Sequence, residues 1–207
     1  GYLEPGDKFL DFVGPLGNPS EIKKYGKIVC VGGGVGVAPV YPIARALYEE
    51  GNYIISILGA RSHEFLIWEE KMKAVSNDIY IMTDDGTYGE KGFVTDALSK
   101  IISEQDIDMV LAIGPIGMMQ SVCELTRPKQ IKTLVSLNPI MLDGTGMCGA
   151  CRVEVGNERK FACVDGPEFD GHLVDWDNLK QRSLMFKEQE DFVLNHKCNC
   201  HAKEVER

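Results

Sequence analysis

Residues 27–39 read Lys27-Ile-Val-Cys-Val-Gly-Gly-Gly-Val-Gly-Val-Ala-Pro39. The first half is a continuous apolar run, typical of a buried strand, and the second half is a glycine-rich turn. A segment of helical character, Ala38–Glu50, follows. Glycines let the backbone approach a pyrophosphate closely, and the amino end of the next helix attracts the same anion. The order favours a dinucleotide site, although a tight strand-to-helix connection without a ligand would read similarly.

Further β-rich runs alternate with amphipathic segments such as Phe93–Ser103, which is the pattern of a parallel sheet covered by helices on both faces. The predicted strands are Lys27–Gly32, Tyr53–Leu58, Ile79–Thr83, Met109–Ile113 and Lys132–Ser136. We therefore expect an α/β fold in which residues 21–138 form a five-stranded, doubly wound, Rossmann-like domain. From Leu137 onward the pattern breaks into loops that contain glycine, aspartate and cysteine.

Three loops follow predicted strands at the edge where open α/β sheets bind ligands. They are Gly59-Ala-Arg61, Thr83-Asp-Asp-Gly86 and Gly114-Pro-Ile-Gly-Met118. Arg61 stands where an acidic residue often accepts a ribose diol, and it could hold a 2′-phosphate or stack on adenine, so NAD and NADP both stay open. The predicted cofactor-binding residues are Gly33, Gly34, Gly36, Val37, Ala38, Pro39, Gly59, Ala60, Arg61, Thr83, Asp85, Gly86, Gly114, Pro115 and Met118.

A second motif lies in the segment Asp143-Gly-Thr-Gly-Met-Cys148-Gly-Ala-Cys151, with Cys163 downstream. With cysteine in place of Asp143 it would be the C-x4-C-x2-C…C ligand pattern of a plant-type [2Fe–2S] cluster. A carboxylate is a hard oxygen donor that can ligate ferric iron. The glycines let the backbone turn its amides toward the cluster. We predict a metal site formed by Asp143, Cys148, Cys151 and Cys163.

Zinc is the alternative for this motif, since Cys198, Cys200 and His201 could add ligands from the tail. The D-x4-C half favours iron–sulfur, because it has no place in ordinary zinc-ribbon spacing. Cys198 and Cys200 have no other assigned role.

Composition narrows the function classes. A formal charge of −9 argues against nucleic acid as a partner, and no apolar run is long enough to cross a bilayer. Seven cysteines, an odd and unevenly spaced set, suit a reducing compartment, so we expect a cytoplasmic location. Cys30 and Cys123 are expected to be buried. The histidines are expected to be surface residues; they are His63, His172, His196 and His201.

The tail contains one further predicted element, a helix over Asp175–Glu190. Its apolar residues Trp176, Leu179, Leu184 and Phe186 are expected to pack back on the domain, although a solvated charged helix is an alternative.

Taken together, these motifs resemble the ferredoxin–NADP reductase-like electron-transfer subunits, and the resemblance covers nearly the whole chain. The motifs that carry it, in the family's order, are Gly14-Pro-Leu-Gly17-Asn-Pro19, Gly32–Pro39, Thr83-x-Asp85-Gly86 with Gly92-x-Val94-Thr95, Gly114-Pro115 with Met118, and the cluster loop. Two branches look closest. In the dihydroorotate dehydrogenase electron-transfer subunits four cysteines hold the cluster. In the small subunit of NADH-dependent reduced ferredoxin:NADP oxidoreductase, also called sulfide dehydrogenase, an aspartate takes the first ligand position, as Asp143 does here.

The resemblance implies a mechanism and a missing part. Family members pass hydride from NAD(P)H to FAD, and the cluster then relays single electrons to a larger flavin and iron–sulfur subunit, so no catalytic side chain is expected. Ferredoxin is a further candidate partner. The family's N-terminal FAD barrel is largely absent, so residues 1–20 would be its remnant and 139–207 the [2Fe–2S] region with the tail. We expect a piece of a longer flavoprotein, inactive without its FAD domain.

Two alternatives to this function remain. One is the dihydroorotate dehydrogenase electron-transfer subunit, and the other is a nucleotide-binding module with structural zinc.

Overall fold

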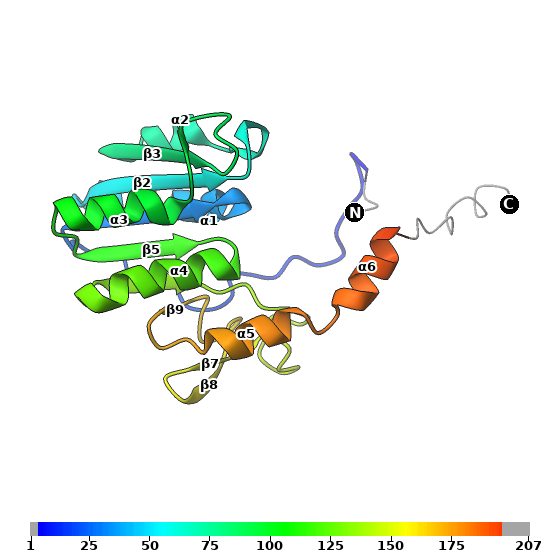
Figure 1. Ribbon diagram of the computed structural model, residues 1–207. Coiled ribbons are helices and arrows are strands. Elements are labelled where there is room, and N and C mark those ends of the chain that lie inside the picture. Colours follow the sequence, from blue (N-terminus) through cyan, green and yellow to red (C-terminus); the bar gives the residue numbers. More distant parts are fainter. Residues whose placement is uncertain (1–3, 196–207) are drawn as a thin grey trace, which may run out of the picture.

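The computed structural model describes residues 4–195 and contains a seven-stranded sheet and a separate two-stranded hairpin (Figure 1). The strands are β1 (Lys27–Gly33), β2 (Tyr53–Ala60), β3 (Asp78–Thr83), β4 (Glu90–Lys91), β5 (Met109–Ile113), β6 (Lys132–Ser136), β7 (Arg152–Val155), β8 (Glu158–Phe161) and β9 (Glu168–Asp170). The helices are α1 (Val37–Glu49), α2 (Glu69–Lys73), α3 (Val94–Glu104), α4 (Ile116–Thr126), α5 (Trp176–Ser183) and α6 (Lys187–Asn195).

The large sheet has the order β4-β3-β2-β1-β5-β6-β9, and the five predicted strands form its parallel centre. The predicted strand count is nevertheless wrong, because two short strands extend the sheet at its edges. β4 has two residues and pairs parallel with β3, whereas β9 comes from the tail and pairs antiparallel with β6. Neither short strand has the apolar run on which the prediction rested.

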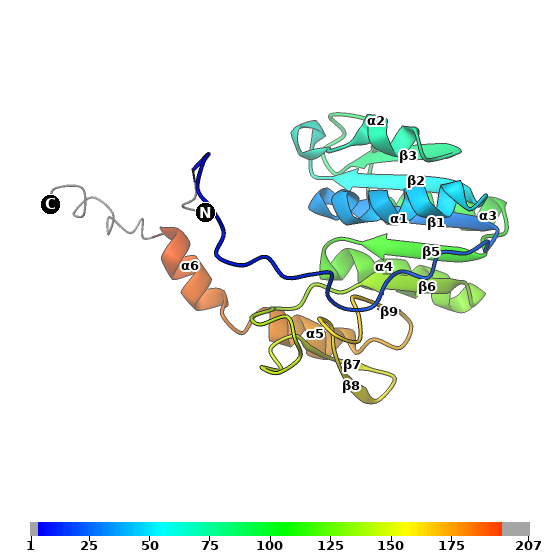
Figure 2. The ribbon, with the colours of Figure 1, turned by 180° about the vertical axis from the view of Figure 1, so that it is seen from behind.

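Both faces of the sheet are buried, which explains the unbroken apolar runs in its strands. Val29 and Ile55 face the side covered by α3 and α4, while their neighbours Ile28 and Ile54 face the side covered by α1 and α2. Figures 1 and 2 show these two helical layers from opposite sides. The fully buried side chains of the central strands remove much apolar surface from water, each contributing about 1.5–3 kcal/mol.

The turn between β1 and α1 packs directly on the end of β5. A Cβ atom on Gly36 would lie 2.2 Å from the carbonyl oxygen of Ile113, and one on Gly32 would lie 2.9 Å from Cγ2 of Val37. Glycine is therefore required at both positions by close approach. Pro39 lies in the first turn of α1, where its missing N–H costs little.

The tail departs from the predicted single helix. It forms α5 and α6 instead, separated by a short turn. Trp176 and Leu179 are buried as expected, but Leu184 and Phe186 are 62% and 46% exposed. The apolar spacing thus predicts the part that packs, and the charged remainder leaves the sheet domain (Figure 1).

Single residues also test the sequence-based expectations. Cys30 and Cys123 are buried, as predicted. His63 is exposed, but His172 is partly buried and its Nε2 lies 2.9 Å from the hydroxyl of Thr126, so its assignment to the surface is wrong. The expectations for His196, Cys198, Cys200 and His201 fall outside the described residues.

The N-terminal segment runs along the domain without forming a strand in residues 4–20, where the end of a barrel was expected. Its backbone attaches near the cluster loop, since Asn18 N donates to Gly166 O at 2.7 Å.

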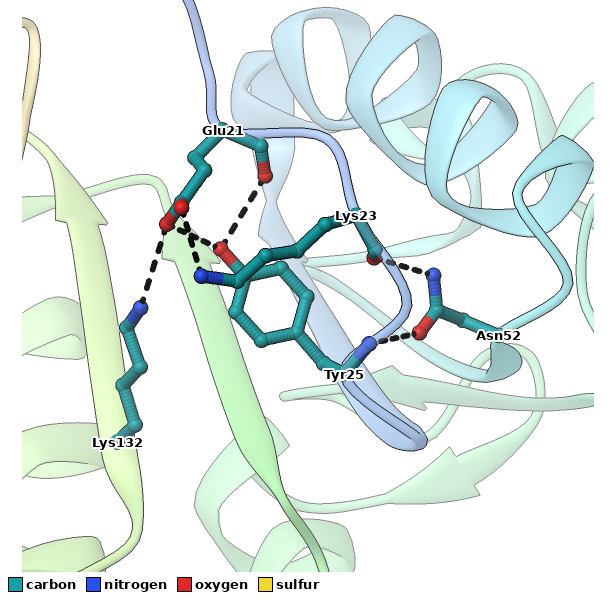
Figure 3. A network of polar contacts seen from close by, with 5 residues as sticks. All are labelled: Glu21, Lys23, Tyr25, Asn52 and Lys132. Carbon is teal, nitrogen blue, oxygen red and sulfur yellow. Dashed lines mark hydrogen bonds and ion pairs between the residues drawn. The ribbon is translucent and has the colours of Figure 1, made fainter.

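The residues that follow this segment, just before β1, are anchored to the loop before β2 by the polar network of Figure 3. Tyr25 donates its hydroxyl to the Glu21 carboxylate at 2.8 Å, and Asn52 bonds the backbone of Lys23 and Tyr25. Partial burial and the Glu21 carboxylate raise the pKa of Tyr25 to about 12.

Within residues 4–195, none of the helices combines the length and the apolar character that crossing a membrane would require.

The close approach at Gly36 leads to a stability prediction. Gly36→Ala is expected to lower the free energy of unfolding by about 1–3 kcal/mol, because the added methyl meets backbone atoms that cannot move cheaply. Urea unfolding measures the change. Gly117→Ala in α4 is the matched control, since its Cβ would meet nothing within 4 Å, and it should be neutral or stabilising. Equal losses in both variants would contradict the packing argument.

Candidate functional site

A cavity of about 890 Å³ lies over the carboxyl ends of the parallel strands. The loops after β1, β2, β3 and β5 all contribute to its wall, as expected for a ligand site in an open α/β sheet. The predicted residues that line it are Gly33, Gly34, Gly59, Ala60, Arg61, Pro115 and Met118.

The other predicted cofactor residues lie behind this wall or beside it. Val37 is buried under the glycine turn, Ala38 is half-buried and Pro39 is exposed. A Cβ on Gly114 would collide with Met118. The residues outside the lining are Gly36, Val37, Ala38, Pro39, Thr83, Asp85, Gly86 and Gly114.

Thr83 and Asp85 hold the loop that follows β3. The buried Thr83 hydroxyl donates to Tyr88 O at 2.6 Å and accepts from Tyr88 N at 3.2 Å. The Asp85 carboxylate accepts from the backbone N–H of Thr87 at 2.9 Å and from its hydroxyl at 2.7 Å, and these donors lower the pKa of Asp85. Both side chains therefore shape the loop, and it is the neighbouring Asp84 from this loop that lines the cavity.

Several lining residues were not predicted. Phe65 and Phe93 are 55% and 63% exposed and offer flat apolar faces. The signal available in the sequence was an aromatic residue in the loop after a predicted strand for Phe65, and one at the start of a predicted helix for Phe93. Glu64 and Ser121 carry no such signal, because acidic and hydroxyl side chains are common on solvated surfaces. The remaining unpredicted lining residues are Val35, Ile67, Gly92, Val94, Thr95 and Gly117.

The electrostatics of the cavity are mixed. Arg61 supplies a cation, and Glu64 and Asp84 supply two carboxylates to the same cavity wall. The amino end of α1, at Val37, has no side-chain cap, so the glycine turn presents backbone donors where an anion could bind.

The predicted cluster residues form two pairs. Cys151 and Cys163 are buried, and their Sγ atoms lie 3.2 Å apart. Asp143 and Cys148 are exposed on the loop above, where the Asp143 carboxylate accepts the backbone N–H of Cys148 at 2.8 Å. The loop can close this tightly because Gly144, Gly146 and Gly149 all have positive φ angles.

The pKa shifts tie the two pairs together. The backbone N–H groups of Thr145 and Cys148 and the Cys148 side chain lower the pKa of Asp143. Burial and the neighbouring Cys151 raise the pKa of Cys163, while the N–H of Gly146 opposes this rise and the charge of Asp143 adds to it. The four side chains therefore share one electrostatic environment.

The predicted donors, three thiols and a carboxylate, are of the kinds that ligate iron. Among the described residues, no three His, Cys, Asp or Glu side chains converge on the point that one metal ion would occupy. Two neighbouring pairs with glycine amides between them suit a cluster whose two irons each take two protein ligands.

Comparisons with known proteins agree with these two halves. A family model described as the oxidoreductase NAD-binding domain matches residues 30–124, and one described as the iron-sulfur cluster binding domain of dihydroorotate dehydrogenase B matches residues 138–175. In solved structures, a chain of the NADH-dependent reduced ferredoxin-NADP oxidoreductase, reported for insights into flavin-based electron bifurcation, is 50% identical with a TM-score of 0.85. The match covers 92% of this chain and 68% of that one. The chain belongs to the ferredoxin–NADP reductase-like electron-transfer subunits.

Other members of the family are close in sequence. A dihydroorotate dehydrogenase B (NAD(+)) electron transfer subunit homolog from Thermotoga maritima is 55% identical over 89% of this chain, and the electron transfer subunit from Shouchella clausii is 37% identical over 77%. The chain spans 65% and 62% of the length of these two relatives.

The Thr83 contacts lead to a prediction for the loop after β3. Thr83→Val should cost about 1–3 kcal/mol of stability, because it leaves both backbone groups of Tyr88 without their partner. Chemical denaturation measures the loss. Thr87→Val is the exposed comparison, because its hydroxyl also has two partners, His63 N at 2.9 Å and the Asp85 carboxylate at 2.7 Å, but water can replace both exposed bonds. A loss as large as that of Thr83→Val would refute the proposed role of burial.

Proposed function

We propose that this chain is part of an electron-transfer flavoprotein subunit that passes electrons between NAD(P)H, FAD and a [2Fe–2S] cluster, and from the cluster to a partner subunit. The observation that carries the proposal is the presence, in one chain, of a dinucleotide-sized cavity and a loop region with two pairs of candidate cluster ligands. Each motif alone fits several functions, whereas their combination fits electron transfer.

The nucleotide is proposed to lie across the carboxyl edge of the sheet. Gly33 and Gly34 would let the backbone approach the pyrophosphate, and the uncapped amino end of α1 would face its charge. Pro115 and Met118 would border the nicotinamide end, while Phe65 and Phe93 supply apolar faces for planar rings. Arg61 shares the cavity wall with the carboxylates of Glu64 and Asp84, so both NAD and NADP remain candidate ligands.

The cluster is proposed to be held by the two ligand pairs. In this proposal Cys151 and Cys163 would ligate one iron, and Asp143 and Cys148 would ligate the other. When bound, a [2Fe–2S] cluster supplies one-electron transfer. The chain itself contributes a buried thiol pair that excludes water and a loop whose amides face the ligands. No acid or base among the side chains is needed for this role.

The surface around the loop supports a protein partner. Met147, Leu142, Met141 and Val164 are exposed apolar side chains on or near it, with Met147 89% exposed. Such a group is more typical of an interaction surface than of solvated loops. We propose a larger flavin and iron–sulfur subunit as this partner, with ferredoxin as a further candidate, and a cytoplasmic location.

We further propose that FAD is bound by an N-terminal β-barrel largely absent from these residues, with 1–20 as its remnant, 21–138 as the nucleotide domain and 139–207 as the cluster region with the tail. The partial coverage of the relatives supports this division. Without the barrel the fragment should not transfer hydride.

A second candidate is the dihydroorotate dehydrogenase electron-transfer subunit, which the names of several relatives favour. Copurification separates the two candidates. A large NADP-binding flavin and iron–sulfur subunit would support the first, and a dihydroorotate-oxidising subunit would support the second.

The cluster can be tested by the visible spectrum of anaerobically purified protein. We expect red-brown absorption that bleaches with dithionite and is lost in Cys163→Ser. Cys123→Ser, which removes a buried thiol far from the loop in sequence, should keep the spectrum. A colourless protein that contains zinc and cannot be reconstituted with iron and sulfide would refute the cluster and support the zinc alternative.

The ligand role of Asp143 has its own test. Asp143→Cys should keep a [2Fe–2S] cluster but change its reduction potential and electron paramagnetic resonance signal, because a thiolate replaces a hard oxygen donor. An unchanged potential and signal would show that Asp143 is not a ligand.

The nucleotide cavity can be tested at Gly117, which lines it from α4 and has open space around its Cβ position. Gly117→Leu is expected to weaken NAD(P)H binding at least tenfold by filling the cavity, while Gly117→Ala should bind nearly normally. Isothermal titration calorimetry measures both. Equal affinities for the two variants would place the nucleotide elsewhere.

A further inference from the structure

Two arginines donate hydrogen bonds to the turn between Cys148 and Cys151. Arg152 opens β7 and donates through Nη1 to the carbonyl oxygen of Gly149 at 3.2 Å. Arg182 lies near the end of α5 and donates through Nη2 to the carbonyl oxygen of Ala150 at 3.0 Å. The two carbonyls belong to consecutive peptide groups, so the turn is held at two adjacent points.

The first of these peptide groups also donates its N–H to a sulfur atom. The Gly149 carbonyl and the Ala150 N–H belong to one planar unit, and this N–H donates to Cys148 Sγ at 3.4 Å. Because the unit is rigid, a guanidinium bound to its oxygen also sets the direction of its N–H. Hydrogen bonding at the carbonyl polarises the amide as well, which strengthens the bond to sulfur.

The two arginines bring positive charge that is not held in an ion pair within residues 4–195, although the charge of Glu154 acts on Arg182. No ion pair within residues 4–195 involves Arg152 or Arg182, whereas Arg159 pairs with Glu154 at 2.9 Å. Nε of Arg182 is buried and has no hydrogen-bond partner among the described residues. Burial lowers the pKa of Arg182, and the neighbouring Arg152 and Arg159 lower it further. The positive charge of these two arginines would favour a negatively charged group bound in the loop.

We propose that Arg152 and Arg182 are positioning residues that hold the Cys148–Cys151 turn and raise the reduction potential of its cluster. The inference rests on the proposed function, since it requires a cluster on the four predicted ligands. Reduction adds one electron and one negative charge and breaks no bond. Fixed cations and N–H···S bonds favour the more negative state. Arg182 lies beyond residues 138–175, so the iron–sulfur family match does not include it.

The test is the midpoint potential of the cluster in the loaded protein, followed by electron paramagnetic resonance during an anaerobic titration. Arg152→Gln and Arg182→Gln should each shift the reduction equilibrium about tenfold toward the oxidised form, which is 59 mV for one electron. Arg182→Lys keeps the charge but loses the planar fork, and its potential should lie between those of the wild type and Arg182→Gln.

Arg159→Gln is the matched control, because it removes a guanidinium from the same part of the molecule that is already paired with Glu154. Its potential should stay near that of the wild type. Wild-type potentials in both Arg152→Gln and Arg182→Gln would overturn the inference, as would an equal shift in the Arg159 control.

Loss of the cluster in a variant is also informative. If Arg182→Gln keeps its circular dichroism melt but loses the cluster, and Arg182→Lys retains it, the positioning role is supported. If Arg182→Gln unfolds, Arg152→Gln and Arg182→Lys decide through their potentials. A wild-type protein that takes up no cluster overturns the proposed function itself. A loaded wild type whose arginine variants keep its potential overturns only the role proposed for Arg152 and Arg182.

Discussion

The parallel pairing of β1 with β2 on one side and β5 on the other is the constraint on which the rest of the structure depends. Parallel strands end at the same edge, so this pairing brings together the glycine turn, the loop at Arg61 and the loop at Pro115. The turn then has to pass close to the end of β5, and only glycine at position 36 leaves room for it. The cavity thus lies where strand order brings these loops together.

The sequence predicts this framework well because its signals are local. A strand buried on both faces must be apolar throughout, and a turn that passes against backbone must contain glycine. Loop conformation is less predictable, as the two neighbouring aspartates after β3 show. Asp85 bonds its own loop through Thr87 and Asp84 lines the cavity, an outcome decided by hydrogen bonds that do not appear in the spacing.

The tail shows the same limit at longer range. β9 exists because Phe169 and its neighbours pair with β6, a contact between segments far apart in the chain. His172 is partly buried because Thr126 and Thr133 form a hydrogen-bonded group beneath it. Neither feature has a local pattern. By contrast, the iron–sulfur prediction rests on spacing within one short loop, which supplies three of the four predicted ligands, and the iron-sulfur family match covers that loop.

The hairpin of β7 and β8 has a consequence for two of the thiols. Cys151 directly precedes β7 and Cys163 follows β8, so the pairing of Arg152 with Phe161 brings the two cysteines together, and Ala162 N donates to Cys151 O at 3.1 Å. The two cysteines are 12 positions apart in the chain, so their approach is a contact of low sequence separation. The buried thiol pair therefore depends on a two-stranded hairpin and not on the seven-stranded sheet.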